Sequence, residues 1–130
     1  EVLLTPTKIY VKPIFHAMKH ATIKGMAHIT GGGFIENIPR MLPKGLAAHI
    51  NQGTWEVPEV FAFLQDHGKL NRDEMYNIFN MGIGMVVAVA PADAKVLIDA
   101  LAVAGEKSFA IGTVQKATES SNVSNFLLNK

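Results

Sequence analysis

The chain has 130 residues, enough for one domain with a sizeable core and too few for two full domains. Apolar residues make up 48% of the sequence and charged residues only 18%, which argues against a disordered chain. The 12 basic and 11 acidic side chains leave a formal charge of +1, so we expect neither nucleic acid nor a membrane as a partner. The sequence holds no cysteine, which excludes disulfides, zinc–thiolate sites and cysteine nucleophiles.

The longest apolar run covers residues 81–92, and Gly82, Gly84 and Pro91 interrupt it. It is shorter than the roughly 20 residues that span a membrane, so we expect a soluble protein. The sequence opens with Glu1 in place of Met and carries no basic and apolar leader. We therefore expect a piece of a longer protein.

Prolines and glycines mark the boundaries of the elements predicted in the first half of the chain. Pro13 suits the first turn of a helix, and Pro39 and Pro43 limit a later helix from its C-terminal side. Predicted in chain order are an extended stretch at residues 3–8, a helix to about residue 20, a strand at 25–30, a helix at 34–41 and a strand at 45–50.

The second half predicts two helices, a strand, a further helix and a final strand. Gly68 suits the left-handed position just past the first of these helices. Asn71 followed by Glu74 resembles a capping box for the second, which Gly82 would end. The continuous apolar run at 83–90 is typical of a central strand covered on both faces. Predicted after it are a helix capped by Asp93 and closed by Gly105, and a strand at about 109–114.

This order of elements predicts about four strands with helices between them, an α/β or α+β sandwich. The composition changes after Lys116, where Ser and Asn become frequent. We therefore expect one domain at residues 1–117 and a polar, flexible tail at 118–130, in which residues 126–128 dock back as a small apolar anchor.

The most informative stretch is HITGGGFIENIPR at residues 28–40, which joins a predicted strand to a predicted helix. Its three glycines let backbone N–H groups approach a ligand, and the start of the helix adds free donors and a positive dipole end. The junction therefore suits phosphate or another anion, and the alternative is a tight turn without a ligand. The candidate site residues of this stretch are His28, Thr30, Gly31, Gly32, Gly33, Asn37 and Arg40.

The loop has neither the Gly-Lys-Ser/Thr of a P-loop nor the G-x-G-x-x-G spacing of a dinucleotide fingerprint. His16 and His20 lie four residues apart on a predicted helix. They are either two ligands of one metal ion or two solvated side chains. We favour the solvated pair and assign no metal, because no third ligand lies close in sequence.

Two further groups of residues have two possible roles each. Asn80, Gly82 and Gly84 form either a helix cap with close packing or a second wall of the ligand site. Lys8 is either a solvated charge or a partner of a phosphate.

Three motifs, in this order, resemble the phosphoribosylformylglycinamidine cyclo-ligases, also called aminoimidazole ribonucleotide synthetases. They are LLTPTKIYVK at residues 3–12, AHITGGG at 27–33 with NIPR at 37–40, and NMGIGM at 80–85. The match follows the family's C-terminal domain from Leu3 to about Lys116.

The resemblance implies an ATP-dependent ring closure in purine biosynthesis. ATP activates the formyl amide oxygen of formylglycinamidine ribonucleotide, a nitrogen attacks, and ADP and phosphate are released as aminoimidazole ribonucleotide forms. The implied fold is a three-layer α/β sandwich around a roughly four-stranded sheet, with some ferredoxin-like character.

The resemblance also implies that ATP and Mg²⁺ are bound mainly by an N-terminal domain, whose Asp-rich and Gly-rich stretches do not occur in this sequence. No cofactor is therefore expected in this chain, which would be inactive alone. The implied partners are formylglycinamidine ribonucleotide, the N-terminal domain and a second copy in a homodimer, and the implied location is the cytoplasm.

On this resemblance, the backbone at residues 31–33 and the helix start at Phe34 hold a phosphate of substrate or nucleotide. His28 and Thr30 then line the cleft, where His28 polarises the amide or moves a proton; the alternative is a packed histidine at a strand end. Arg40 is either a phosphate ligand or a surface ion-pair partner, and Asn37 bonds either ligand or loop.

Two other functions stay open. One is an ATP-dependent enzyme of the same architecture with another substrate, like selenophosphate synthetase or thiamine-monophosphate kinase. The other is a non-catalytic interaction domain.

Overall fold

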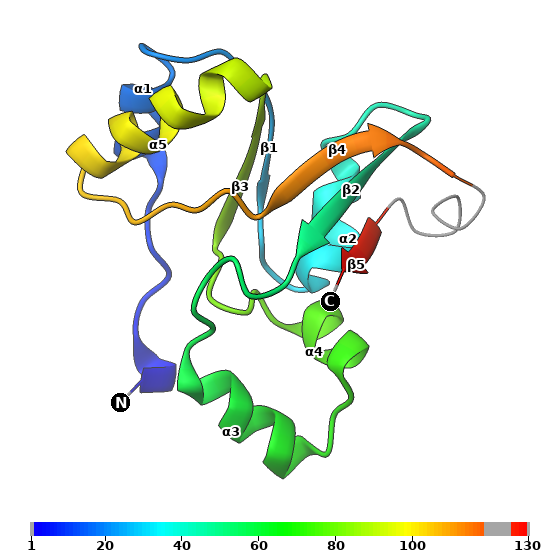
Figure 1. Cartoon of the computed structure of the whole chain (residues 1–130). Helices are drawn as coiled ribbons and strands as arrows, with labels where there is room; N and C mark the ends of the chain where they lie inside the picture. The colour runs from blue at the N-terminus through cyan, green and yellow to red at the C-terminus, as the bar shows by residue number, and fades with distance from the viewer. Residues whose placement is uncertain (1, 119–125, 130) are drawn as a thin grey trace. The chain divides into compact units, whose positions relative to one another are not determined.

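The computed structural model describes residues 2–118 and 126–129 (Figure 1). The chain folds as two compact units. Unit 1 comprises Glu1–Gly25 and Val87–Ala110, and unit 2 comprises Met26–Val86 and Ile111–Lys130. The predicted tail lies partly outside the described residues, at 119–125 and 130.

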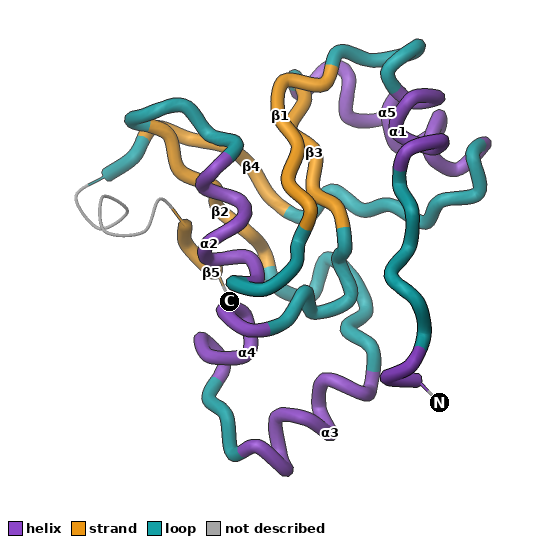
Figure 2. The backbone as a smooth tube through the Cα atoms, turned by 180° about the vertical axis from the view of Figure 1, so that it is seen from behind, coloured by secondary structure: helices purple, strands orange, loops and turns teal. Residues whose placement is uncertain are grey.

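The described chain contains five α-helices and five strands (Figure 2). In chain order they are α1 (Val11–Ala17), β1 (Ile23–His28), α2 (Gly33–Arg40), β2 (Leu46–Asn51), α3 (Glu59–Gly68), α4 (Arg72–Ile78), β3 (Met85–Val89), α5 (Ala94–Val103), β4 (Gly112–Lys116) and β5 (Phe126–Asn129). Short 3-10 turns cover Val2–Leu4 and Pro91–Asp93. The predicted order of elements as far as β4 and the mixed α/β class are confirmed.

The strands divide between two sheets, in place of the single sheet of about four strands that the sequence predicts. β1 pairs with β3, and β2 lies between β4 and β5. β2 runs antiparallel to β4, with Ala48 opposite Val114, and parallel to β5, with Ala48 opposite Phe126. Residues 126–128 of the predicted tail are thus paired to β2 through the backbone.

The prediction that residues 83–90 form a central strand is wrong. Among the described strands, β3 pairs with β1 alone, and Val86 is its one buried residue. A run of apolar residues indicates apolar neighbours, but it carries no information about how many strands lie beside it.

In unit 1, helices α1 and α5 pack together over a small apolar cluster. Ala17, Ala21, Leu97 and Leu101 are buried there, with Ile23, Val87 and Val89 packed against them. As predicted, Gly105 takes a left-handed conformation (φ 82°) after the end of α5. Asp93 precedes α5, but its side chain makes no capping hydrogen bond, because its backbone is already helical in the preceding 3-10 turn.

In unit 2, the core is built around Phe34, whose side chain is fully buried. The Phe34 ring lies 5.8 Å from that of Trp55 and 5.3 Å from that of Tyr76, between ring centroids. The Trp55 Nε1–H donates a 2.9 Å hydrogen bond to the Met81 carbonyl, so the indole both packs and holds the turn before β3. Helix α2 packs against α4, β2 and β5.

The ends of α3 and α4 differ in part from the prediction. The capping box of Asn71 and Glu74 is confirmed at the start of α4. Gly68, however, is the last residue of α3, and Lys69 takes the left-handed position (φ 50°). Helix α4 ends at Ile78, before Gly82, because the chain turns extended at Phe79. A cap pattern places a helix end only to within a residue or two.

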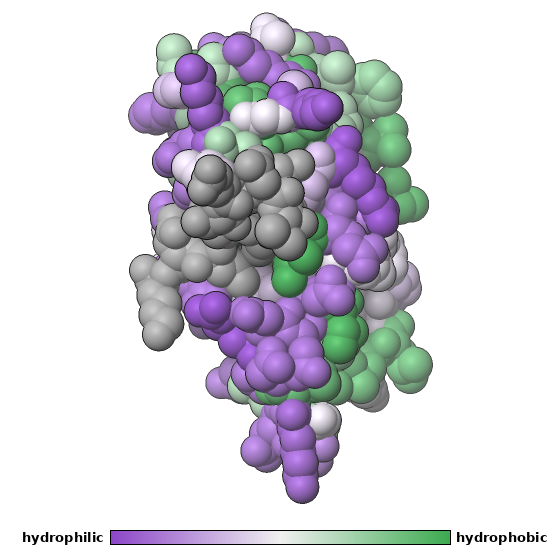
Figure 3. Space-filling view, turned by 90° about the vertical axis from the view of Figure 1, so that its right-hand side faces the viewer, coloured by the Kyte–Doolittle hydropathy of each residue, from purple (hydrophilic) through white to green (hydrophobic). Residues whose placement is uncertain are grey.

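Helix α3 contains no buried residue. The lower part of the face seen in Figure 3, where α3 and α4 lie, is mainly hydrophilic, with apolar atoms at its edge. No helix among the described residues has the length and apolar character needed to cross a membrane.

Leu97→Ala tests the core of unit 1. Leu97 is 4% exposed, so we expect its truncation to lower the free energy of unfolding by about 2–4 kcal/mol. Val103→Ala on the same helix is the matched control, because Val103 is 80% exposed, and its effect should stay within about 0.5 kcal/mol. Urea denaturation measures both, and equal losses would contradict the packing of α5 on this cluster.

Candidate functional site

The glycine loop, defined as Thr30–Gly33, is anchored at both ends by buried apolar residues. Before it, Ile29 is 2% exposed, and its N–H donates a 2.8 Å hydrogen bond to the Gly84 carbonyl. After it, Phe34 is fully buried in the core of unit 2. Thr30 and Gly31 between these anchors are exposed. The fold therefore holds a short exposed segment between two firmly packed points.

The fold requires glycine at two of the three glycine positions of the loop, for different reasons. Gly33 has a φ of 53°, and a Cβ there would overlap the Tyr76 carbonyl oxygen of α4. Gly32, the residue before α2, has a φ of 90°, and a Cβ there would lie 2.6 Å from Glu36 Oε2. Gly31 is different, because a Cβ there would meet no atom within 4 Å. Two glycines are therefore required by the fold, while the third leaves open space beside the loop.

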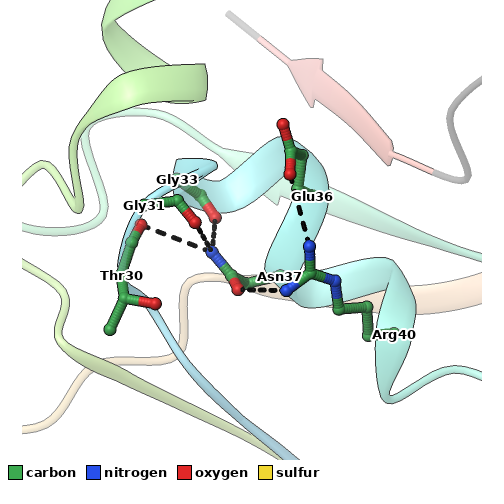
Figure 4. A network of polar contacts seen from close by, with 6 residues as sticks. All are labelled: Thr30, Gly31, Gly33, Glu36, Asn37 and Arg40. Carbon is green, nitrogen blue, oxygen red and sulfur yellow. Dashed lines mark hydrogen bonds and ion pairs between the residues drawn. The ribbon is translucent and has the colours of Figure 1, made fainter.

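Asn37, on α2, joins the loop to the helix that follows it (Figure 4). Its side chain is 6% exposed, and its Nδ2 donates to the carbonyls of Gly33 at 2.8 Å, Gly31 at 3.2 Å and Thr30 at 3.4 Å. Of the two roles open for Asn37, the structure places its amide in contact with the loop.

Arg40 lies one turn further along α2 and contacts two neighbours. Its guanidinium donates to Asn37 Oδ1 at 3.1 Å and pairs with Glu36 Oε2 at 3.3 Å. Both charged side chains are more than half exposed, so the ion pair itself adds little stability. Sequence reasoning missed Glu36, although its i, i+4 spacing to Arg40 is a signal that would have found it.

A shallow hollow of about 220 Å³ lies beside this network. It is lined by Met26, Ala27, His28, Asn37, Arg40 and Met41. The structure thus brings together the three candidate side chains His28, Asn37 and Arg40. Thr30 and the glycines adjoin them through the loop.

The N–H groups of the loop divide into used and available donors. The Gly33 N–H donates to the Thr30 carbonyl at 2.9 Å, which closes the turn. Within the described part of the chain, neither the Gly31 N–H nor the Gly32 N–H donates a backbone hydrogen bond. These two backbone donors are the ones that a bound group can use.

The candidate second wall, at Asn80, Gly82 and Gly84, lies next to the start of the loop through the Gly84 carbonyl. Asn80 Oδ1 accepts a 3.0 Å hydrogen bond from the Gly82 N–H. Gly82 has a φ of 92°, and a Cβ there would lie 2.5 Å from Pro58 Cδ. Asn80 and Gly82 therefore have evident roles in a tight, closely packed turn.

Lys8 belongs to unit 1, where it forms an ion pair with Glu106 at 2.5 Å. The His16 and His20 rings, also in unit 1, lie 5.0 Å apart between centroids. Among residues 2–118 and 126–129, no three His, Asp or Glu side chains gather where they would bind a metal ion.

Tyr76 of α4 is a neighbour of the loop that no sequence signal indicated. Its backbone carbonyl leaves no room for a side chain at position 33, and its ring packs on Phe34. Burial raises the pKa of the Tyr76 phenol above its ordinary value of 10.0, and the Arg72 charge opposes this in part. The phenol is therefore neutral near pH 7 and acts as a packing group.

Residues 1–123 match the family described as AIR synthase related protein, C-terminal domain, and the chain belongs to this family. It is 58% identical over 116 residues to a phosphoribosylformylglycinamidine cyclo-ligase of Bacillus velezensis and 56% identical over 116 residues to that of Bacillus subtilis. It is 60% identical over 118 residues to the protein of the same name from Bacillus cereus. These matches cover 89%, 89% and 90% of this chain.

The chain spans about a third of the length of these curated relatives, 34% in each of the three. The resemblance that the three motifs indicated is therefore confirmed at the level of the family.

Gly33→Ala and Gly31→Ala separate the structural glycines from the open one. We expect Gly33→Ala to lower the free energy of unfolding by more than about 1 kcal/mol, because Ala is strained at this φ and overlaps Tyr76. Gly31→Ala should leave it unchanged or raise it by up to about 1 kcal/mol, since its Cβ meets open space. Thermal or urea unfolding measures both variants. A larger loss of unfolding free energy for Gly31→Ala than for Gly33→Ala would refute the assignment of Gly33 as the structurally required glycine.

Proposed function

We propose that the protein containing this chain is an ATP-dependent cyclo-ligase of purine biosynthesis. It closes formylglycinamidine ribonucleotide to aminoimidazole ribonucleotide and releases ADP and phosphate. The observation that carries the proposal is the 56–60% identity, over about nine-tenths of the chain, to relatives that bear the cyclo-ligase name. The glycine loop beside a hollow lined by His28 supports it.

In this proposal, the chain forms one wall of the active site. ATP and Mg²⁺ are held mainly by an N-terminal domain. ATP supplies the phosphoryl group that makes the formyl oxygen of the substrate a leaving group. The enzyme acts as a homodimer in the cytoplasm.

The loop backbone binds a phosphate of substrate or nucleotide in this proposal. The Gly31 and Gly32 N–H groups donate to it, and the positive end of α2 adds to the attraction. Thr30 and His28 line the cleft, where the imidazole polarises the amide or moves a proton during ring closure. The network of Glu36, Asn37 and Arg40 holds this edge of the cleft, with Arg40 available to a phosphate.

Other candidate residues complete the cleft. Asn80, Gly82 and Gly84 form its second wall beside the loop. The contacts of Gly84 with Ile29 support the wall.

Exposed apolar side chains in unit 1 support the proposal that another domain covers this part of the chain. Leu3, Leu4 and Ile9 are 70%, 84% and 79% exposed. A covering domain would bury these side chains.

A hybrid enzyme tests the function. In it, this chain replaces the matching third of the Bacillus subtilis relative. We expect the hybrid to convert formylglycinamidine ribonucleotide and ATP to aminoimidazole ribonucleotide, detected as the diazotisable amine, with one phosphate released per turnover. His28→Gln should lower kcat about 100-fold or more, as loss of an acid–base group does.

Lys44→Ala is the control, since Lys44 is an exposed cation outside the site, and its kcat should match that of the unmodified hybrid. A folded hybrid that consumes ATP only with selenide or thiamine monophosphate as phosphoryl acceptor would replace the proposed reaction. A folded hybrid without any of these activities would reject the enzyme proposal.

A further inference from the structure

The side-chain amide of Asn37 has no donor left for an anionic ligand. An NH₂ group carries two protons, and three carbonyl oxygens, those of Thr30, Gly31 and Gly33, already lie within 3.4 Å of this nitrogen. The oxygen of the same amide accepts from Arg40 and cannot donate to an anion. Asn37 is therefore unsuited to hold a phosphate itself.

The hydrogen bonds of Asn37 set the direction of the loop peptides. In a planar trans peptide, the C=O of one residue and the N–H of the next point in opposite directions. The Thr30 and Gly31 carbonyls point toward the Asn37 amide (Figure 4). The Gly31 and Gly32 N–H groups therefore point away from it. The two available backbone donors are thus turned outward because the two carbonyls are held inward.

Arg40 determines which way the Asn37 amide faces. A side-chain amide turned by 180° would place its oxygen against three carbonyl oxygens and its NH₂ against the guanidinium. Arg40 Nη1 donates to Asn37 Oδ1 at 3.1 Å, and Glu36 holds the other end of the guanidinium at 3.3 Å. This chain of contacts keeps the donating end of the amide on the loop.

We propose that Asn37 is a positioning residue of the cyclo-ligase site, oriented by Arg40, which turns the Gly31 and Gly32 N–H groups toward the bound phosphate without contacting it. This role rests on the proposed function. It revises the expectation that Asn37 binds the phosphate itself.

The first test needs no variant and uses the ¹⁵N-labelled chain titrated with inorganic phosphate, with chloride at equal ionic strength as the control. We expect the backbone amide signals of Gly31 and Gly32 to shift with phosphate while the side-chain NH₂ signals of Asn37 stay in place. Larger shifts of the Asn37 NH₂ signals would make it a direct ligand and overturn the proposal. Unmoved Gly31 and Gly32 signals would overturn it as well.

The second test uses Asn37→Asp, which keeps the shape of the side chain and removes its donors. In the hybrid enzyme, we expect KM for formylglycinamidine ribonucleotide to rise at least 10-fold, with kcat at saturation changed less than threefold. Arg40→Lys retains a donor for Asn37 Oδ1 and should stay within threefold of the unmodified KM, whereas Arg40→Met should raise it at least fivefold.

The experiments distinguish failure of the positioning role from failure of the cyclo-ligase function. An active hybrid with an unchanged KM in Asn37→Asp would reject the positioning role and leave the cyclo-ligase function standing. An inactive hybrid whose isolated chain binds phosphate at Gly31 and Gly32, and loses at least 10-fold in affinity with Asn37→Asp, would reject the function and support the positioning role.

Discussion

The hydrogen bonds of one buried side-chain amide tie the end of β1 to the start of α2, and the candidate site is built on them. The Asn37 amide reaches three carbonyls of a segment that is otherwise exposed. A buried polar group that loses its partners costs about 1–3 kcal/mol, so the loop and the amide stabilise each other. Phe34 and Ile29 then fasten the two ends of the loop to apolar surroundings. A glycine-rich segment, which would be flexible alone, is thereby held in one shape.

The three consecutive glycines divide their tasks between fold and site. Gly33 permits α2 to approach the backbone of α4, and Gly32 permits the left-handed residue before α2. Neither needs a ligand to explain it. Among the residues that the structure describes, none imposes such a requirement at Gly31, and Gly31 carries one of the two outward N–H groups. A run of glycines in a sequence thus combines residues required by packing with a residue that leaves space for a partner.

Local signals in the sequence predicted the order of elements well, and long-range arrangements were beyond them. The capping box at Asn71 and the glycine at 105 depend on neighbours three or four residues away, so the sequence displays them directly. The division of strands into two sheets depends on which segments meet across the chain, as β2 meets β4 and β5. Apolar runs such as residues 83–90 do not encode that choice.

For the candidate site, too, the sequence indicated local features but not contacts with distant segments. The motif at residues 28–40 identified the loop and its neighbours, because their types are unusual and close together in sequence. It could not tell whether Asn37 faces a ligand or the loop, since both roles need the same amide. It also gave no sign of Tyr76, whose carbonyl sets the limit at Gly33 from another helix.

In this structure, Asn37 holds the glycine loop in shape before any ligand arrives. The most direct measurement is the scalar coupling across hydrogen bonds in the ¹⁵N,¹³C-labelled chain without phosphate. We expect a coupling between Asn37 Nδ2 and the carbonyl carbon of Gly33, the shortest of the three contacts at 2.8 Å, with NH₂ protons that exchange slowly with water. No detectable coupling, together with NH₂ protons that exchange as fast as those of the exposed Asn77, would contradict the account.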